Sequence, residues 1–251
     1  MLADDLLCAL DRPTFMRGLG VEPDPWQERA LRTESKQSLW CCSRQAGKST
    51  VAALFALHQA LYYPGSLVLL VSPTLRQSGE LFRKVMDWVD RMPLRPAMDE
   101  ESKLFCTLSN GSRIISLPGS EGTVRGYSAV DLVIEDESSR VDDLLYFAVR
   151  PMLATSGGRL ILMSTPYGTR GHFYSEWRNG VDWDRIEVPA TECPRISKEF
   201  LEGERRTMGE RWYSQEYGCQ FVSTLDQVFD LEAVNRAITP TIKPLFKGAH
   251  Q

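Results

Sequence analysis

The sequence predicts an α/β fold in which a central, mostly parallel sheet is covered by helices on both faces. Short apolar runs typical of buried strands recur along the chain, and helical patterns follow most of them, as in repeated strand–helix units. The 251 residues are enough for one large α/β domain, or for one domain with a small appendage. In such a sheet the loops after the strands carry the chemistry.

The first predicted unit is a strand, a loop and a helix. Residues 38–42 form an apolar run, and a helical pattern extends from Lys48 to Leu61 before the Pro64-Gly65 break. Between them lies the pattern of a phosphate-binding loop, G-x-x-x-x-G-K-[ST], with Cys42 in place of the first glycine. The alternative, a Gly-Lys-Ser sequence at an ordinary helix start, is disfavoured by the order of the elements.

In this kind of loop, backbone N–H groups surround the phosphates at a helix N-terminus. The lysine reaches the β- and γ-phosphates, and the serine hydroxyl binds Mg²⁺. We therefore expect ATP to bind the following loop residues: Ser43, Arg44, Gln45, Ala46, Gly47, Lys48, Ser49 and Thr50.

The elements that follow continue the alternation. Apolar runs predict the strands, and an Asn-Gly pair between two of these runs indicates an antiparallel hairpin. The predicted elements are a strand at 66–72, a helix at 77–89, hairpin strands at 104–108 and 113–117, a strand at 130–135, a helix at 142–149 and a strand at 159–164.

Two carboxylates come directly after the predicted strand at 130–135. Asp136 is placed to hold Mg²⁺, and Glu137 to orient and deprotonate the attacking water, which is the division of labour that phosphoryl transfer to water requires. The alternative is an acidic helix start, because carboxylates also favour a helix N-terminus. A phosphate loop upstream favours the catalytic interpretation.

Three further residues are candidates for the nucleotide site. Thr165, after the strand at 159–164, could hydrogen-bond the γ-phosphate or the water and report hydrolysis, or it could be part of a turn. Near the N-terminus, the amide of Gln27 could pair with the adenine edge, and Trp26 could pack nearby.

Arginines can stabilise the charge that develops on the γ-phosphate. Arg44 lies in the loop and is placed to act within its own subunit. Arg76, Arg83 and Arg125 are candidates for an arginine supplied to a neighbouring subunit, and a solvated or ion-paired arginine is the alternative for each of them.

Composition limits the remaining possibilities. Hydrophobic residues make up 43% and charged residues 25%, and no apolar run approaches the roughly 20 residues of a membrane helix. The N-terminus lacks the pattern of a signal peptide, so we expect a cytosolic protein without membrane contact. The six cysteines and three histidines show no zinc-site spacing. A net charge of −4 means that any nucleic-acid contact is local or is assembled from several subunits.

Charged and aromatic helical segments at 199–206 and 210–217 follow the last predicted strand. We expect an ATPase core at 1–188 that includes an N-terminal helical segment at 1–36, a small lid or linker subdomain at 189–240, and the start of a connector at 241–251. The basic clusters around Arg195 and Arg205 could contact DNA or form solvated helix faces.

Taken together, these motifs resemble the large terminase subunit of tailed bacteriophages, over about residues 25–229. The resemblance rests on Pro25-Trp26-Gln27, Ser43 to Thr50, Val124-Arg125-Gly126, Val133 to Glu137, Ser164 to Gly168, Gly171 to Tyr174 and Gln215 to Phe221. It includes the phosphate loop without a first glycine and with a basic residue at Arg44.

The resemblance implies a three-layer P-loop NTPase of the ASCE/RecA-like class, with ATP as substrate and Mg²⁺ as cofactor. It implies that Gln27 belongs to the adenine motif, Lys48 is the Walker A lysine, Asp136 and Glu137 are the Walker B metal ligand and catalytic carboxylate, and Thr165 lies in the coupling motif.

The resemblance also implies a motor that drives double-stranded DNA through a portal protein into a procapsid, in the host cell cytoplasm. The implied partners are the small terminase subunit and further copies of the chain, in a ring that we expect to be a pentamer on the capsid and a monomer in isolation. We expect the ATPase portion alone, without the family's nuclease domain, because no acidic cluster for two metals follows the lid. A helicase or translocase ATPase is the alternative function, and a non-enzymatic nucleotide-gated assembly module is disfavoured by Glu137.

Overall fold

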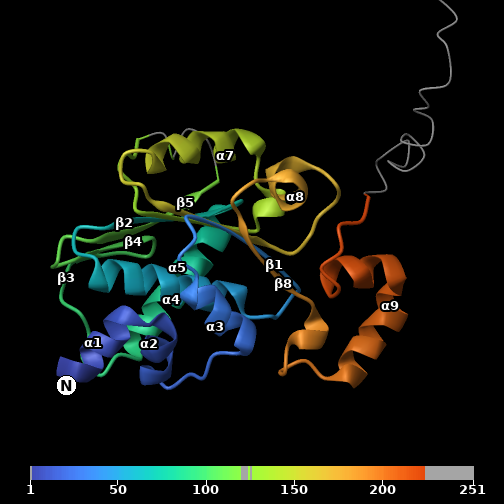
Figure 1. Ribbon diagram of the computed structural model, residues 1–251, viewed down its shortest axis with the longest axis horizontal. Helices are drawn as coiled ribbons and strands as arrows, with labels where there is room; N and C mark the ends of the chain where they lie inside the picture. The colour runs from blue at the N-terminus through green and yellow to red at the C-terminus, as the bar shows by residue number, and fades with distance from the viewer. Residues whose placement is uncertain (1, 120–123, 125, 224–251) are drawn as a thin grey trace, which may run out of the picture.

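A computed structural model describes residues 2–119, 124 and 126–223 and contains an eight-stranded mixed sheet with helices on both faces (Figure 1). Five strand pairs are parallel, and β4 is antiparallel to both of its neighbours. This arrangement confirms the predicted sheet and the predicted hairpin. In spatial order the strands are β3 (Met98–Glu101), β4 (Phe105–Leu108), β5 (Arg113–Pro118), β2 (Leu67–Ser72), β6 (Leu132–Asp136), β7 (Arg159–Ser164), β1 (Gln37–Cys42) and β8 (Asp184–Val188).

Alternating side chains divide the interior into two hydrophobic cores, one on each face of the sheet. In β1, Trp40 and Cys42 belong to one core, whereas Leu39 and Cys41 belong to the other. The strand pleat causes this division because successive side chains point to opposite faces. All four side chains are fully buried, as expected for a central parallel strand that is covered on both sides.

Two sets of helices cover these cores (Figure 1). One face carries α1 (Leu2–Leu10), α2 (Arg12–Gly18), α3 (Pro25–Arg32), α4 (Lys48–Tyr62) and α5 (Leu75–Asp90), and the other carries α7 (Asp143–Val149) and α8 (Gly171–Asn179). Helix α5 begins two residues before the predicted start because the Thr74 side chain accepts a hydrogen bond from the Gln77 N–H and caps the helix. Short 3₁₀ helices, η1 (Ser138–Arg140), η2 (Arg150–Leu153) and η3 (Ala190–Glu192), lie between larger elements.

Beyond β8 the chain leaves the sheet and forms α9 (Lys198–Glu216). Gly209 interrupts this helix with φ 77° and ψ 164°, so the two helical segments predicted from the sequence are confirmed. A small cluster of Ala190, Leu201 and Tyr217 holds α9 to the segment before it. The predicted connector at 241–251, and the part of the lid segment after residue 223, lie outside the described residues.

Strands β3 and β8 form the two edges of the sheet, and neither is apparent in the sequence pattern. Asp99, Glu100 and Glu101 make β3 acidic and exposed. Within the described part of the chain, no helix has both the length and the apolar character required to cross a bilayer.

Candidate nucleotide-binding site

The phosphate loop connects β1 to α4. Its first position, Cys42, lies in the buried strand and does not have a positive φ, which explains why glycine is dispensable there. The left-handed positions are Gln45 (φ 61°) and Gly47 (φ 94°). The left-handed conformation of Gly47 favours glycine, and a Cβ atom there would also lie 2.9 Å from Gln27 Nε2, so that this side chain would have to shift.

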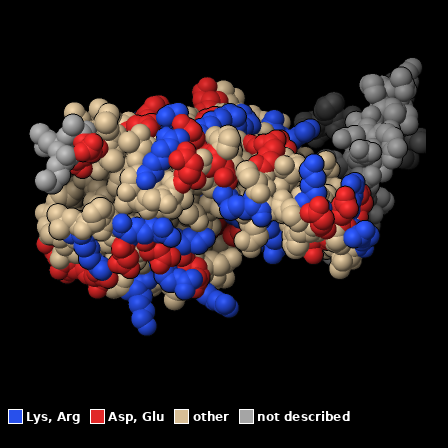
Figure 2. All heavy atoms as spheres, turned by 90° about the horizontal axis from the view of Figure 1, so that it is seen from below, with Lys and Arg blue, Asp and Glu red and all other residues tan. Residues whose placement is uncertain are grey.

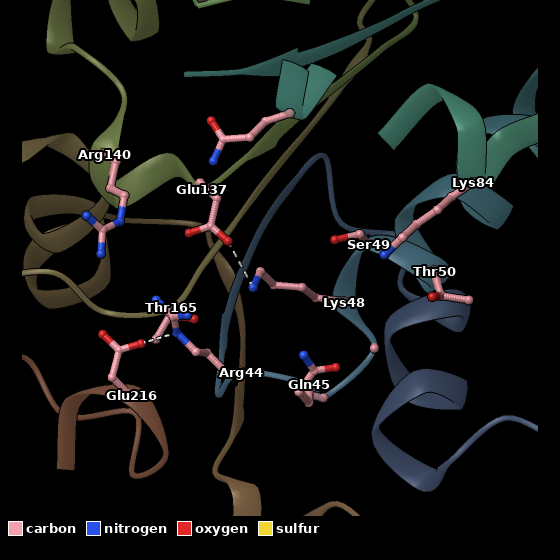
Figure 3. A pocket seen from close by; sticks show the side chains of 13 residues that line it. Arg44, Gln45, Lys48, Ser49, Thr50, Lys84, Glu137, Arg140, Thr165 and Glu216 are labelled. Atoms are coloured by element: carbon pink, nitrogen blue, oxygen red, sulfur yellow. Dashed lines mark hydrogen bonds and ion pairs between the residues drawn. The ribbon is translucent and has the colours of Figure 1, made fainter. Parts of the chain in front are cut away.

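The loop lysine contacts the predicted catalytic carboxylate. Lys48 Nζ lies 3.2 Å from Glu137 Oε1, and Figure 3 shows the two side chains pointing toward one another. Burial of Lys48 disfavours its charged form, but the charges of Glu137 and Asp136 outweigh burial and raise the pKa of Lys48. The ammonium group is therefore charged where the phosphates of a nucleotide would lie.

The loop serine contacts the other carboxylate. Ser49 Oγ donates a hydrogen bond of 3.3 Å to Asp136 Oδ2, and Asp136 is buried. Burial raises the pKa of Asp136, and the nearby Lys48 opposes this effect. A hydroxyl and a carboxylate oxygen fit Mg²⁺, which usually takes one or two carboxylates and completes its shell with substrate phosphates and water.

Glu137 has an unusual backbone conformation. Its φ of 53° and ψ of 38° place it in the left-handed region, which is uncommon for a residue other than glycine. Its N–H donates to Asp136 Oδ1 at 2.9 Å, and its carbonyl accepts from the Arg140 N–H at 2.8 Å. The surroundings therefore hold the conformation that directs this carboxylate into the site.

These groups line a cavity of about 630 Å³. Its walls are formed by loop residues 44–50 together with Gln77, Lys84, Glu137, Arg140, Thr165 and Glu216. Thr165 is buried, and its carbonyl accepts a 2.5 Å hydrogen bond from Ser139 Oγ. Loop residues 44–50, Glu137 and Thr165 thus surround one cavity. Asp136 does not line it but accepts a hydrogen bond from Ser49, which does.

Four residues of the cavity wall were not predicted from the sequence. Gln77 comes from α5. Figure 3 shows the other three, Lys84 from α5, Arg140 from η1 and Glu216 from the end of α9. Burial lowers the pKa of Lys84, and the charge of Asp136 counteracts this effect. Arg140 lies over the ring of Tyr167 at 3.9 Å. No local sequence pattern marks these residues, because only the folded chain brings them to the loop.

The interaction of Arg44 with Glu216 joins the phosphate loop to α9. The Arg44 guanidinium forms an ion pair with the Glu216 carboxylate. The backbone N–H of Arg44 also donates a hydrogen bond of 3.0 Å to the backbone carbonyl of Glu216. Arg195 provides a second connection, because its guanidinium donates to the Ala46 carbonyl at 3.0 Å and pairs with Asp24 at 2.7 Å. Arg195, one of the basic residues considered above for DNA contact, is therefore bound to the phosphate loop.

The predicted adenine residues lie close to the loop but do not line the cavity. Trp26 is buried in the core, and Gln27 Oε1 accepts a hydrogen bond from the Asp24 N–H at 3.0 Å. Ser43 is also buried, and its N–H donates to the Val188 carbonyl at 2.9 Å.

Two of the other candidate arginines, Arg76 and Arg83, do not line the cavity. Arg76 and Arg83 are exposed on α5, and Arg83 pairs with Glu80. Arg125 lies outside the described residues. Arg205, of the second basic cluster, pairs with Glu210. Figure 2 shows a face on which basic and acidic side chains lie among one another.

A phosphate loop between a buried parallel strand and a helix, facing two carboxylates at the end of another parallel strand, defines the RecA-like (ASCE) class of P-loop NTPases. Within this class, the chain belongs to the family described as terminase large subunit, T4likevirus-type, N-terminal, which matches residues 40–236.

Individual relatives agree with this assignment. The large terminase subunit of Thermus virus P23-45 is 25% identical, over 86% of this chain and 52% of that protein. The large terminase subunit of Escherichia phage T5 is 27% identical, over 76% of this chain and 45% of that protein. The chain therefore spans about half the length of these relatives.

Solved structures show the same fold. The large terminase ATPase domain of Thermus phage P74-26 matches with a TM-score of 0.73 and 23% identity, over 83% of this chain and 97% of that chain. A large terminase from another thermophilic bacteriophage, solved in complex with ADP, matches with a TM-score of 0.63 and 13% identity, over 82% of this chain and 52% of that chain.

Proposed function

We propose that this chain is an ATP-hydrolysing motor domain that powers the translocation of double-stranded viral DNA into a procapsid. Its membership of the terminase family supports the motor role. The observation that carries the enzymatic part is the meeting of the phosphate loop with two carboxylates, Lys48 with Glu137 at 3.2 Å and Ser49 with Asp136 at 3.3 Å. A nucleotide-binding module without hydrolysis would not require Glu137.

The proposed reaction begins when the phosphates of ATP enter the loop. Lys48 then exchanges its contact with Glu137 for the phosphates, and the freed carboxylate accepts a proton from the attacking water. The water oxygen forms a bond to the γ-phosphorus as the bond to the β-phosphate oxygen breaks, which leaves ADP and phosphate. Ser49 Oγ and Asp136 would hold Mg²⁺, which neutralises charge on the phosphate oxygens when it is bound.

The other predicted residues have roles around this step. Arg44 would turn from Glu216 toward the γ-phosphate, and Thr165 would report the loss of that phosphate to α8. Trp26 and Gln27 would support the loop from the adenine side. Arg125 remains a candidate for an arginine supplied to a neighbouring subunit.

The larger assembly follows from the same proposal. Residues 1–188 would be the motor core, residues 189–240 the lid, and residues 241–251 the start of a linker to a nuclease domain. The motor would act in the host cytoplasm as a ring, for which we expect a pentamer on the capsid and a monomer in isolation. Its partners would be the portal protein, the small terminase subunit and DNA.

ATP turnover in the presence of Mg²⁺ tests the enzymatic part. We expect Lys48→Ala to weaken productive nucleotide binding, and Glu137→Gln to bind ATP while losing roughly 10²- to 10⁴-fold in turnover. Lys198→Ala, at the exposed start of α9, is the matched control and should retain the wild-type rate. Wild-type turnover by Glu137→Gln would exclude the proposed base.

Two further measurements address the motor. Specific activity that rises with protein concentration would support an arginine supplied by a neighbour, and a constant specific activity would contradict it. A forked DNA duplex in the same reaction distinguishes the alternative function, because a helicase separates the strands and a packaging motor leaves them paired.

A further inference from the structure

A fully buried carboxylate lies next to the proposed metal ligand. Glu135 is 0% exposed, whereas Asp136, the following residue, reaches Ser49 on the other face of the sheet. Glu135 points toward the core that contains Tyr146 of α7 and Phe173 of α8, because side chains alternate along β6. Burial of a carboxylate in an apolar core costs free energy unless charged or hydrogen-bonding partners compensate for it.

His172 provides part of that compensation at Glu135 Oε1, whereas Oε2 has no hydrogen-bond partner among the described residues. Its Nε2 lies 2.7 Å from Glu135 Oε1, and its Nδ1 lies 2.9 Å from Asp143 Oδ1. A carboxylate at each ring nitrogen requires a hydrogen on both nitrogens, which is the charged imidazolium form. Burial opposes this charge, but the hydrogen bonds and charges of Glu135 and Asp143 raise the pKa of His172. The ring also stacks on Tyr146, with centroids 4.5 Å apart and planes at 7°.

The same network reaches the segment that follows Glu137. Ser138 Oγ donates to Glu135 Oε1 at 2.5 Å and lies 3.0 Å from His172 Nε2. The next residue, Ser139, donates to the Thr165 carbonyl at 2.5 Å. The segment after Glu137 is therefore bound to the start of α8 through one serine and to the Thr165 loop through the other.

Glu137 depends on this attachment because its backbone is left-handed, with φ 53°. A residue other than glycine keeps this conformation only when the surrounding structure holds it. Residues on both sides of Glu137, namely Glu135 and Ser138, contact His172. His172 does not itself belong to the cavity wall formed by the described residues.

We propose that His172 is a positioning residue for ATP hydrolysis. By binding Glu135, Ser138 and Asp143 together, it fixes the backbone around Glu137 and keeps that carboxylate directed at the attacking water. It also joins the end of β6 to α8, so that Glu137 and the Thr165 loop stay in a fixed position relative to each other. This inference rests on the proposed ATPase function.

The test compares kcat, KM, the affinity for a non-hydrolysable ATP analogue and the melting temperature. We expect His172→Gln to lower kcat at least tenfold, while KM and analogue affinity stay within twofold, because the phosphate loop is untouched. His58→Gln is the matched control, since His58 is also buried but bonds the Cys8 carbonyl and does not line the cavity. It should lower the melting temperature and leave the kcat of the folded protein unchanged.

A surface variant covers the case in which His172→Gln does not fold. Asp143→Ala removes two hydrogen bonds to His172 from a side chain that is 49% exposed, and it should lower kcat in the same direction with little loss of stability. In a Glu137→Gln background, His172→Gln should reduce the residual rate no further, because His172 acts through Glu137.

Two results would overturn the inference: an unchanged kcat in both variants, or parallel losses of kcat, analogue affinity and melting temperature, which indicate a purely structural role. Failure of the proposed function looks different, because wild-type turnover would then be no faster than that of Lys48→Ala. If the wild type is active and His172→Gln equals it, only the positioning role is refuted.

Discussion

Replacing Glu216 by glutamine should increase the affinity for ATP. The Arg44 guanidinium pairs with the Glu216 carboxylate at the end of α9. If Arg44 must leave this partner to reach the γ-phosphate, part of the binding free energy is spent on breaking the pair. Glutamine retains the shape and one acceptor oxygen but removes the charge.

The magnitude follows from the exposure of the two groups. The Glu216 side chain is 11% exposed and that of Arg44 is 60% exposed, so solvent screens the pair in part. A hydrogen bond to a charged group contributes about 1.5–3 kcal/mol, and a neutral one about 1 kcal/mol. With the low end of this range, removal of the charge makes Arg44 easier to release by about 0.5 kcal/mol, which corresponds to an affinity increase of about twofold.

Calorimetric titration with a non-hydrolysable ATP analogue measures this effect. Glu210→Gln is the matched control, because Glu210 lies on the same helix and pairs with Arg205 rather than with the loop. The increase should become smaller at high ionic strength, since salt screens partly exposed charges. An unchanged or weaker affinity in Glu216→Gln would refute the idea that Arg44 is withheld from the nucleotide.

Three further predictions concern stability, measured as the free energy of unfolding in urea. Burial, and then the charge of Arg12, lowers the pKa of His58 from 6.5 to about 4. The wild type should therefore lose on the order of 3 kcal/mol of unfolding free energy as the pH falls through this window, whereas His58→Gln should not. The same dependence of unfolding free energy on pH in both proteins would contradict a neutral buried ring. The pKa of His172 is raised, so its contribution to the free energy of unfolding is complete below pH 6.5 and is lost as the pH rises above that value. His172→Gln should not show this loss of stability at higher pH. Gly158→Ala would place a Cβ 2.1 Å from the Val130 carbonyl oxygen, so it should destabilise the protein by roughly 3 kcal/mol. The Cβ of Gly203→Ala in α9 would meet no atom within 4 Å, so this variant should stabilise the protein by about 0.5–1 kcal/mol.

The central part of the fold could be predicted because its signals are local. The strand, loop and helix around Lys48, and the apolar run that ends at Asp136, are contiguous patterns that need no tertiary information. The edge strands lack such patterns. β8 contains only two apolar residues among five, and β3 only one among four, so their pairing with β1 and β4 decides their conformation.

The site was predictable only where its residues belong to these motifs. Lys84, Arg140 and Glu216 reach the cavity from three separate elements, and their positions depend on how α5, η1 and α9 pack. Trp26 follows the reverse pattern: it stands beside a motif residue in the sequence, but its side chain packs in the core and does not line the cavity. The buried Glu135 and His172 are 37 positions apart, and neither is conspicuous until the fold brings them into contact.

The acidic edge strand β3 limits how copies of this chain can meet. Asp99, Glu100 and Glu101 lie along one of the two borders of the sheet, and like charges on an approaching copy of the same strand would repel it. Two copies would therefore not join through this border, and on this side the sheet would end within its own subunit. A contact between copies at this border would consist of side-chain interactions, which break and re-form more readily than the backbone hydrogen bonds of a continuous intersubunit sheet.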